Sequence, residues 1–356
     1  MIPAAELPAA FGAPVLSARL RVAPEDFRVD EVLGFEASGE GEHLLVQVEK
    51  RGANTARVAR ELARWAGIGL RDVGFAGMKD RHAVCTQAFT LRLPGRRIPE
   101  PMPESDEFRL LSWQWHRRKL PRGALQGNRF VLRLREVQGE RDAIDTRLHA
   151  IAARGIPNYF GLQRFGHGGG NLELARQLFA GARLPRERRA LALSAARSML
   201  FNTVLAARVD EGSWALGIDG EVWMLEGSRS VFGPEPDDPA LRARCRELDI
   251  HPSGPLWGRG ELRTQAAARA LELAALAPYG EFRSGLERAG LAQERRALRV
   301  RAGGLHWRWI DASTLELAFE LSAGAYATAL LHALGPCADA SGPGDGAQSA
   351  AQRPVD

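Results

Sequence analysis

The stretch VGFAGMKDRHA, residues 73–83, combines a short strand-like run with a polar loop. Gly74 and Gly77 allow the backbone to turn sharply and to approach a ligand closely. Asp80 follows them, flanked by two cations and an imidazole. Such neighbours favour the ionised form of a carboxylate, which a nucleophile requires. The same cluster is also typical of a surface ion pair on a turn, so this stretch alone leaves both interpretations open.

The segments around this loop predict a mixed sheet with helices. Residues 44–50 and 129–135 alternate between apolar and polar side chains, which indicates strands. Residues 55–65 place apolar side chains on one helical face, with Gly67 where a helix would end. The strand pattern returns at residues 315–321, and a helix through Leu334 follows.

The middle of the chain has helical periodicity from about residue 142 onward. We therefore predict an inserted domain at residues 153–305. Residues 1–152 and 306–335 would form the two parts of the other domain. Residues 336–356 are rich in Gly, Ala, Ser, Pro and Asp without periodicity, and we expect them to be a disordered tail.

Composition limits the class of protein. A chain of 356 residues with 45% apolar composition can bury the cores of two domains. The net charge of +5 favours a polyanionic partner such as nucleic acid. No run approaches the roughly 18 to 20 apolar residues of a membrane span, and the N-terminus lacks the features of a signal peptide. We expect a cytoplasmic protein without membrane association.

Metal and disulfide sites have no support in the sequence. The eight histidines show neither HxxxH nor HxE spacing, and the cysteines form no CxxC pair: Cys85, Cys245 and Cys337. We therefore predict no metal ion.

Lysine is rare among the 48 basic residues of the chain, most of which are arginine. Lys79 lies in the Asp80 loop, Lys50 precedes the segment GANT at 52–55, and Lys119 lies in the segment HRRKL at 116–120. This placement suggests that an ammonium group is required there rather than a guanidinium.

Four further segments have an unusual density of aromatic and amide residues: PEDF at 24–27, LQGNRF at 125–130, NYFGLQRFG at 158–166 and SAARSMLFN at 194–202. Together with GFAGMKDRHA they resemble the successive signature segments of the TruD family of tRNA pseudouridine synthases. The resemblance covers most of residues 15–335. Without it, Phe160 and Phe165 would be core residues, Arg164 would contact phosphate or brace a loop, and Arg197 would meet RNA.

The resemblance implies an α+β protein with the pseudouridine synthase fold. This fold is a mixed, largely antiparallel sheet with flanking helices, built here from both chain ends, with an inserted α/β TRUD domain. It also implies isomerisation of uridine to pseudouridine in tRNA, at position 13, by a monomer without a cofactor or metal.

The resemblance also assigns site residues. Asp80 matches the catalytic position, and Phe27, Asn128 and Tyr326 match substrate-contacting positions. From the residues alone, Phe27 could be a buried strand residue and Asn128 a turn residue. Arg21 and Lys79 are both candidates for the cation that pairs with Asp80.

Position 326 usually carries Phe in the family, so the Tyr326 hydroxyl is a departure. It could bond Asp80 or assist removal of the C5 proton. The chemical route also stays open, because Asp80 could attack C1', add to C6 or abstract a proton.

Two other classes of protein remain to be weighed. A non-catalytic RNA-binding protein or tRNA folding chaperone would use the basic surface alone and would not need Asp80. A metal-dependent hydrolase would use Asp80 and His82 as ligands, but the sequence offers no further ligand cluster for it.

Overall fold

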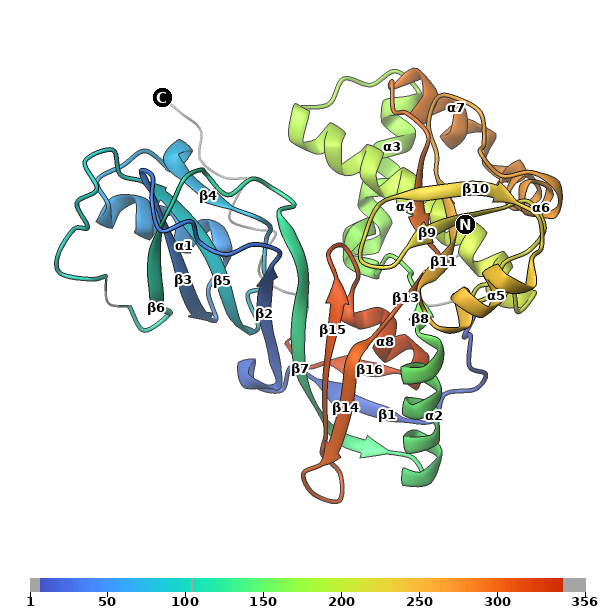
Figure 1. Cartoon of the computed structure of the whole chain (residues 1–356), viewed down its shortest axis with the longest axis horizontal. Coiled ribbons are helices and arrows are strands. Elements are labelled where there is room, and N and C mark those ends of the chain that lie inside the picture. Colours follow the sequence, from blue (N-terminus) through green and yellow to red (C-terminus); the bar gives the residue numbers. More distant parts are fainter. Residues whose placement is uncertain (1–6, 104, 342–356) are drawn as a thin grey trace. The chain divides into compact units, whose positions relative to one another are not determined.

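The computed structural model describes residues 7–103 and 105–341, which form two compact units (Figure 1). The sheet unit comprises Leu16–Glu140, Gly304–Ala323 and the chain from Pro336. The helical unit comprises the chain up to Val15, then Arg141–Gly303 and Gly324–Gly335. Each unit is therefore assembled from segments that lie far apart in the sequence.

These bounds differ from the predicted ranges at two helices. Helices α2 (Arg141–Arg154) and α8 (Ala327–Leu334) belong to the helical unit, although the predicted ranges assigned most of α2 and all of α8 to the other domain. The reason is packing, because α2 and α8 contact each other. The apolar face of α2 is fully buried.

The sheet unit is built mainly from strands. In chain order its elements are β1 (Ser17–Leu20), η2 (Pro24–Asp26), β2 (Phe27–Leu33), β3 (His43–Arg51), α1 (Thr55–Trp65), η3 (Leu70–Asp72), β4 (Val73–Phe75), β5 (Val84–Arg92), β6 (Phe108–His116), β7 (Leu125–Gln138), β14 (Gly303–Trp309), β15 (Leu315–Ser322) and β16 (Cys337–Asp339).

The described strands of this unit form one ten-stranded sheet with the central order β14-β15-β7-β2-β5-β3-β6. The pairs β15–β7, β7–β2, β5–β3 and β3–β6 are antiparallel, whereas β2–β5 and β1–β16 are parallel. The sheet is thus mixed and largely antiparallel, which confirms the predicted α+β class.

Local sequence explains these elements. In β7 the alternating residues Phe130, Leu132 and Leu134 are buried, as the period of two predicts. Helix α1 lies against β3 and β5 (Figure 1). Its buried apolar residues, including Val58 and Leu62, belong to one core cluster with those of β3 and β5. These contacts fix α1 next to the loop between β4 and β5.

The prediction that the chain lacks structure from residue 336 is wrong for Cys337–Asp339. These residues form β16 and pair with β1 in the register Leu20–Asp339. A strand of three residues is too short to show a period in the sequence, and its pairing depends on a distant partner. Residues 342–356 lie outside the described residues.

The helical unit contains the remaining elements. They are α2, β8 (Ile156–Pro157), η4 (Leu162–Phe165), η5 (His167–Gly169), α3 (Gly170–Phe179), α4 (Arg186–Asp210), β9 (Glu221–Leu225), β10 (Val231–Glu235), α5 (Pro239–Arg246), β11 (Ile250–Leu256), α6 (Ala266–Leu276), η6 (Ala277–Tyr279), α7 (Gly280–Arg288), β12 (Glu294–Ala297), β13 (Arg299–Val300) and α8.

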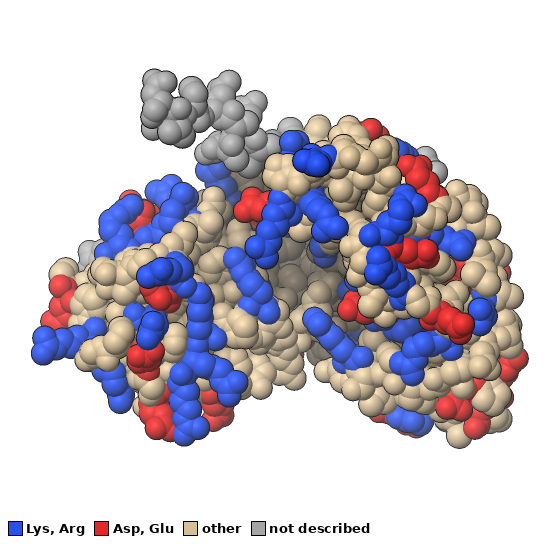
Figure 2. Space-filling view, turned by 90° about the horizontal axis from the view of Figure 1, so that it is seen from above, with Lys and Arg blue, Asp and Glu red and all other residues tan. Residues whose placement is uncertain are grey.

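Helix α4 is the centre of this unit, because α3, α6, α7 and β11 all contact it. By length and composition α4 could cross a membrane, but 67% of its apolar window is buried within the protein. It is therefore a core helix. Figure 2 shows that basic side chains cover more of the visible surface than acidic ones, in agreement with the net charge of +5.

Candidate active site

The loop that carries Asp80 joins β4 to β5, and buried polar side chains hold its backbone. Gln87 donates from Nε2 to the carbonyl of Gly77 at 2.8 Å. The amide of Lys79 donates to Oγ1 of Thr55 at 2.9 Å. Gln87 and Thr55 are fully buried and bond each other at 2.9 Å. The loop is therefore anchored on the sheet and on the first turn of α1.

Lys50 provides a third anchor for this loop. Its ammonium donates to the carbonyls of Asp80 at 2.6 Å and Ala53 at 2.7 Å, and the residue is 1% exposed. Burial lowers the pKa of Lys50, while the neighbouring Cys85 and Asp80 raise it. An ammonium fits here because it is a compact donor that serves two carbonyls at once.

Arg21 forms the ion pair with Asp80. Its Nη2 lies 2.8 Å from Oδ2 of Asp80, and the side chains are 6% and 30% exposed, respectively. Arg21 also donates from Nη1 to the carboxylate of Asp339. The cation is thus buried between two carboxylates, while the Asp80 side chain keeps an open side towards solvent.

Lys79, the other candidate cation, pairs elsewhere. Its Nζ lies 2.8 Å from Oε1 of Glu31 and donates to Oδ1 of Asn128, also at 2.8 Å. The Lys79 and Glu31 side chains are 8% and 2% exposed. The structure therefore brings the Lys79 ammonium to Glu31 and Asn128, and it forms no ion pair with Asp80.

Asn128 is a strand residue rather than a turn residue. It lies in β7 opposite Glu31 on one side and Leu321 on the other. A Cβ atom on the preceding Gly127 would lie 2.5 Å from the carbonyl oxygen of Leu321. Glycine is therefore required there for β15 to approach β7 next to Asn128.

Phe27 lies beneath the ion pair. The residue is 5% exposed, and the guanidinium of Arg21 lies 4.0 Å from the centre of its ring. The ring also contacts Phe130 edge to face at 6.2 Å. In this structure Phe27 supports Arg21 and is part of the sheet core.

Asp339 was missed as a site residue because it lies in the segment predicted to be a disordered tail. Its place follows from the register of β16 with β1, which ends beside Arg21. Burial opposes its ionisation, but hydrogen bonds from Ser341 and the charge of Arg21 leave its pKa below the ordinary value. Glu31 was also missed, and no sequence pattern singles it out.

Tyr326 belongs to the helical unit and directly precedes α8. Its hydroxyl accepts a hydrogen bond of 2.6 Å from Arg164, which also donates to Ser194 at 2.9 Å. Phe160 packs edge to face on the Tyr326 ring at 6.2 Å. Arg164 therefore braces this cluster, which was one of its two predicted roles.

Arg197 was expected to meet RNA, and the structure gives it a different role. It donates to the carbonyls of Trp257, Leu256 and Ala292 and pairs with Glu294. Its side chain is 16% exposed. Arg197 therefore ties α4 to the neighbouring strands.

His82 lies on the same loop as Asp80. The described residues contain no group of three or more His, Cys, Asp or Glu side chains that could hold a metal ion. The hydrolase interpretation therefore lacks a ligand set in this part of the chain. Cys85 lies behind the loop, and burial raises its pKa to about 11, so it stays a thiol at neutral pH.

Comparison with known proteins identifies one family. The family model described as tRNA pseudouridine synthase D (TruD) matches residues 10–178 and 175–334. A protein of Xanthomonas campestris named tRNA pseudouridine synthase D is 56% identical over 351 residues, covering 94% of this chain and 96% of its own. A protein of the same name from Methylococcus capsulatus is 50% identical and covers 92% of this chain and 94% of its own.

A solved structure from Methanosarcina mazei, described as a putative tRNA pseudouridine synthase D, has the same fold. Its TM-score is 0.68 at 20% identity, over 92% of this chain and 95% of that chain.

Proposed function

The chain belongs to the TruD family of tRNA pseudouridine synthases, and we propose that it converts uridine 13 of tRNA to pseudouridine with Asp80 as the nucleophile. In this isomerisation the glycosidic bond breaks, the uracil turns, and C5 joins the ribose. A carboxylate suits the reaction because it can bond to a carbon and leave again.

The assignment to Asp80 rests on a difference in solvent exposure between its side chain and the residues that hold it. The side chain is 30% exposed. The groups that hold it are buried: Arg21 at the carboxylate, and Lys50, Thr55 and Gln87 along the loop. A reactive group held by rigid supports is what proximity catalysis requires.

Three alternative chemical routes are compatible with this arrangement. Asp80 attacks C1' of the ribose, adds to C6 of the uracil, or abstracts a proton on a route through a glycal. Each requires a carboxylate of fixed orientation, which Arg21 provides. None requires an electron acceptor or a metal ion.

The uracil must leave the RNA fold to reach Asp80. We propose that Asn128 contacts its polar edge, because the Asn128 amide is held by Lys79, the residue that precedes Asp80 in the loop. Phe27 acts mainly through Arg21, with its small exposed part facing the substrate. The ring of Tyr326 is proposed to cover the base.

We further propose that the enzyme acts as a cytoplasmic monomer on tRNA, with arginine side chains supplying most of the affinity through phosphate contacts. Analytical ultracentrifugation of the purified protein tests the monomer. A measured mass equal to the 38.8 kDa of one chain would support it, and a multiple of that mass would contradict it.

The decisive variant is Asp80→Asn, which keeps the size of the side chain. Pseudouridine in an unmodified tRNA transcript is mapped by a carbodiimide-dependent stop of reverse transcription. We expect Asp80→Asn to lower kcat by at least about 1,000-fold, and to change the Kd for tRNA by less than about threefold, because phosphate contacts dominate binding. Replacing uridine 13 by cytidine should remove the stop.

Asp249→Asn is the matched control, because Asp249 also pairs with an arginine, Arg244, at 2.6 Å. This variant should keep wild-type turnover. Equal pseudouridine formation by Asp80→Asn and wild type would instead favour the non-catalytic RNA-binding protein.

A further inference from the structure

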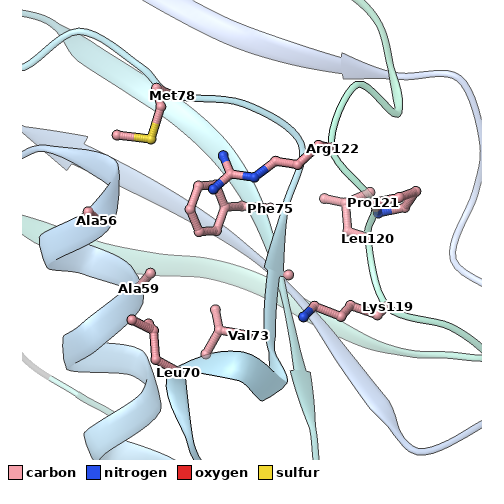
Figure 3. A pocket seen from close by; sticks show the side chains of 11 residues that line it. Ala56, Ala59, Leu70, Val73, Phe75, Met78, Lys119, Leu120, Pro121 and Arg122 are labelled. Carbon is pink, nitrogen blue, oxygen red and sulfur yellow. The ribbon is translucent and has the colours of Figure 1, made fainter. Parts of the chain in front are cut away.

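A cavity opens on the sheet unit, beside the loop that carries Asp80. Its volume is about 570 Å³, within the range of roughly 300 to 1,000 Å³ that is usual for small-ligand sites. Helix α1 forms one wall through Ala56 and Ala59, and β4 forms the floor (Figure 3). The alanines leave room that larger side chains would fill.

The cavity exposes large apolar side chains. Met78 is 60% exposed and Leu70 is 52% exposed, and both line it together with Phe75. A single exposed apolar side chain needs no explanation, but a group of them around one cavity marks a binding site. Figure 3 shows the Phe75 ring and Met78 lying towards the space that α1 bounds.

Two cationic side chains, Arg122 and Lys119, also line this cavity. The guanidinium of Arg122 lies 3.8 Å from the centre of the Phe75 ring and presents a flat cation beside it. Within the described part of the chain, neither Arg122 nor Lys119 forms an ion pair with a carboxylate. Lys119 does donate to the carbonyl of Arg71, but a carbonyl does not neutralise its charge. Both cations can therefore still attract a phosphate.

The segment with these two cations is fixed against β4. A Cβ atom on Gly74 would lie 2.7 Å from Cγ of Lys119 and 2.8 Å from the carbonyl oxygen of Leu120. Gly123 donates to the carbonyl of Ala76 at 2.8 Å. The absence of a side chain at Gly74 thus allows the segment to cross β4 closely and sets Arg122 over Phe75.

We propose that this cavity binds an unpaired nucleoside of the substrate RNA, adjacent to the uridine at Asp80, with its base against Arg122, Phe75 and Met78. Aromatic rings and guanidinium planes are the usual stacking partners of unstacked RNA bases. Lys119 contacts the phosphate of this nucleotide. The inference rests on the proposed function for the identity of the RNA.

Proximity supports a neighbouring nucleotide. Met78 precedes Asp80 by two residues, and two residues of extended chain span at most about 7 Å. The edge of the cavity at Met78 thus lies within about 7 Å of Asp80 along the chain, which is close to the span of one nucleotide. A base held there would keep the RNA strand open beside the target uridine.

The test combines protein variants with altered RNA. Ala56→Phe fills the cavity without a change of charge, and Arg122→Ala removes the stacking cation. The controls are Ala270→Phe, on the exposed side of α6, and Arg97→Ala, which removes a charge from an exposed loop of the sheet unit. Kd is measured for a tRNA transcript and for transcripts that carry one abasic nucleotide at each position flanking the target uridine.

We expect Ala56→Phe and Arg122→Ala each to weaken binding of the intact transcript by about tenfold, the scale of one base–aromatic stack. The controls should change Kd by less than about twofold. One abasic transcript should bind wild type about tenfold more weakly and lose no further affinity with Ala56→Phe. This non-additivity identifies the nucleotide that occupies the cavity.

Two results would overturn the proposal. One is unchanged affinity for the intact transcript in both cavity variants. The other is an equal loss for every abasic transcript, because the cavity would then hold no particular base. Because Kd reports binding and not product formation, failure of wild type to form pseudouridine would contradict the proposed function and leave this test intact.

Discussion

Arg21 donates a hydrogen bond of 2.8 Å from Nη2 to Oδ2 of Asp80, and the cation is far more buried than the carboxylate. The backbone of Arg21 adopts a φ of 56°, which non-glycine residues rarely do. Phe27 lies under its guanidinium, and Asp339 takes its other amino group. The orientation of the Asp80 carboxylate is therefore set by a cation that is itself held from several sides.

Replacement of Arg21 tests this orientation. Arg21→Met keeps much of the packing on Phe27 but removes the hydrogen bond to Asp80. We expect kcat to fall by about 100-fold, the usual effect of a reactive group displaced by about 1 Å. Arg21→Lys should be intermediate, because an ammonium lacks the planar fork that reaches two carboxylates. Single-turnover rates measure the effect, and wild-type rates in Arg21→Met would refute it.

Asp339 should act through Arg21. We expect Asp339→Asn to lower kcat about tenfold at neutral pH with little change in KM, since a neutral amide holds the guanidinium less firmly. Asp339→Glu should restore part of the loss because it returns the charge. If Asp339→Asn lowers only thermal stability and leaves kcat unchanged, Asp339 has a structural role alone.

The pH dependence of stability gives a second readout for Asp339. Its pKa is lowered in the folded chain, so its contribution to stability is complete above the unfolded value of 3.8 and is lost as the pH falls through the folded pKa. The free energies of unfolding of wild type and Asp339→Asn should therefore differ at neutral pH and converge in acid. Urea denaturation across this range measures the difference.

Lys50 should show a dependence of the same sign, but at alkaline pH. Burial lowers its pKa, so the folded chain binds this proton less tightly than the unfolded chain, whose ordinary value is 10.5. Stability should therefore rise with pH in the alkaline window that ends near 10.5. Lys50→Met lacks this component, so urea denaturation between neutral and alkaline pH should give curves that diverge in favour of wild type. Parallel curves would show that Lys50 does not titrate in this window.

Much of the fold could be predicted because its main elements are long and periodic. Strand β7 and helix α4 each carry a pattern that local packing enforces, and the structure contains both. The boundaries between units could not be predicted in the same way. Helices α2 and α8 join the helical unit through contacts between distant parts of the chain, which no local period encodes.

In the candidate site, too, local sequence indicates some residues, whereas others depend on contacts between distant parts of the chain. Asp80, Asn128 and the rare lysines stand in distinctive segments, so the sequence indicates them. The choice of Arg21 over Lys79 as the partner of Asp80 depends on the register of β1 with β16 and of β2 with β7. Asp339 has no local signal, because a strand of three residues gains its place only from its neighbour.

Replacement of Tyr326 tests whether its hydroxyl, a departure from the family pattern, takes part in the reaction. The hydroxyl accepts a hydrogen bond from Arg164, and Arg296 stacks on the adjacent Phe160 at 4.2 Å. Tyr326→Phe removes a hydrogen bond to a charged donor, so we expect a loss of about 1 to 3 kcal/mol in the free energy of unfolding. Because the ring remains, turnover and its pH profile should stay close to wild type, whereas Tyr326→Ala should raise KM. A lowered kcat with a shifted pH profile in Tyr326→Phe would instead assign the hydroxyl a part in proton transfer from C5.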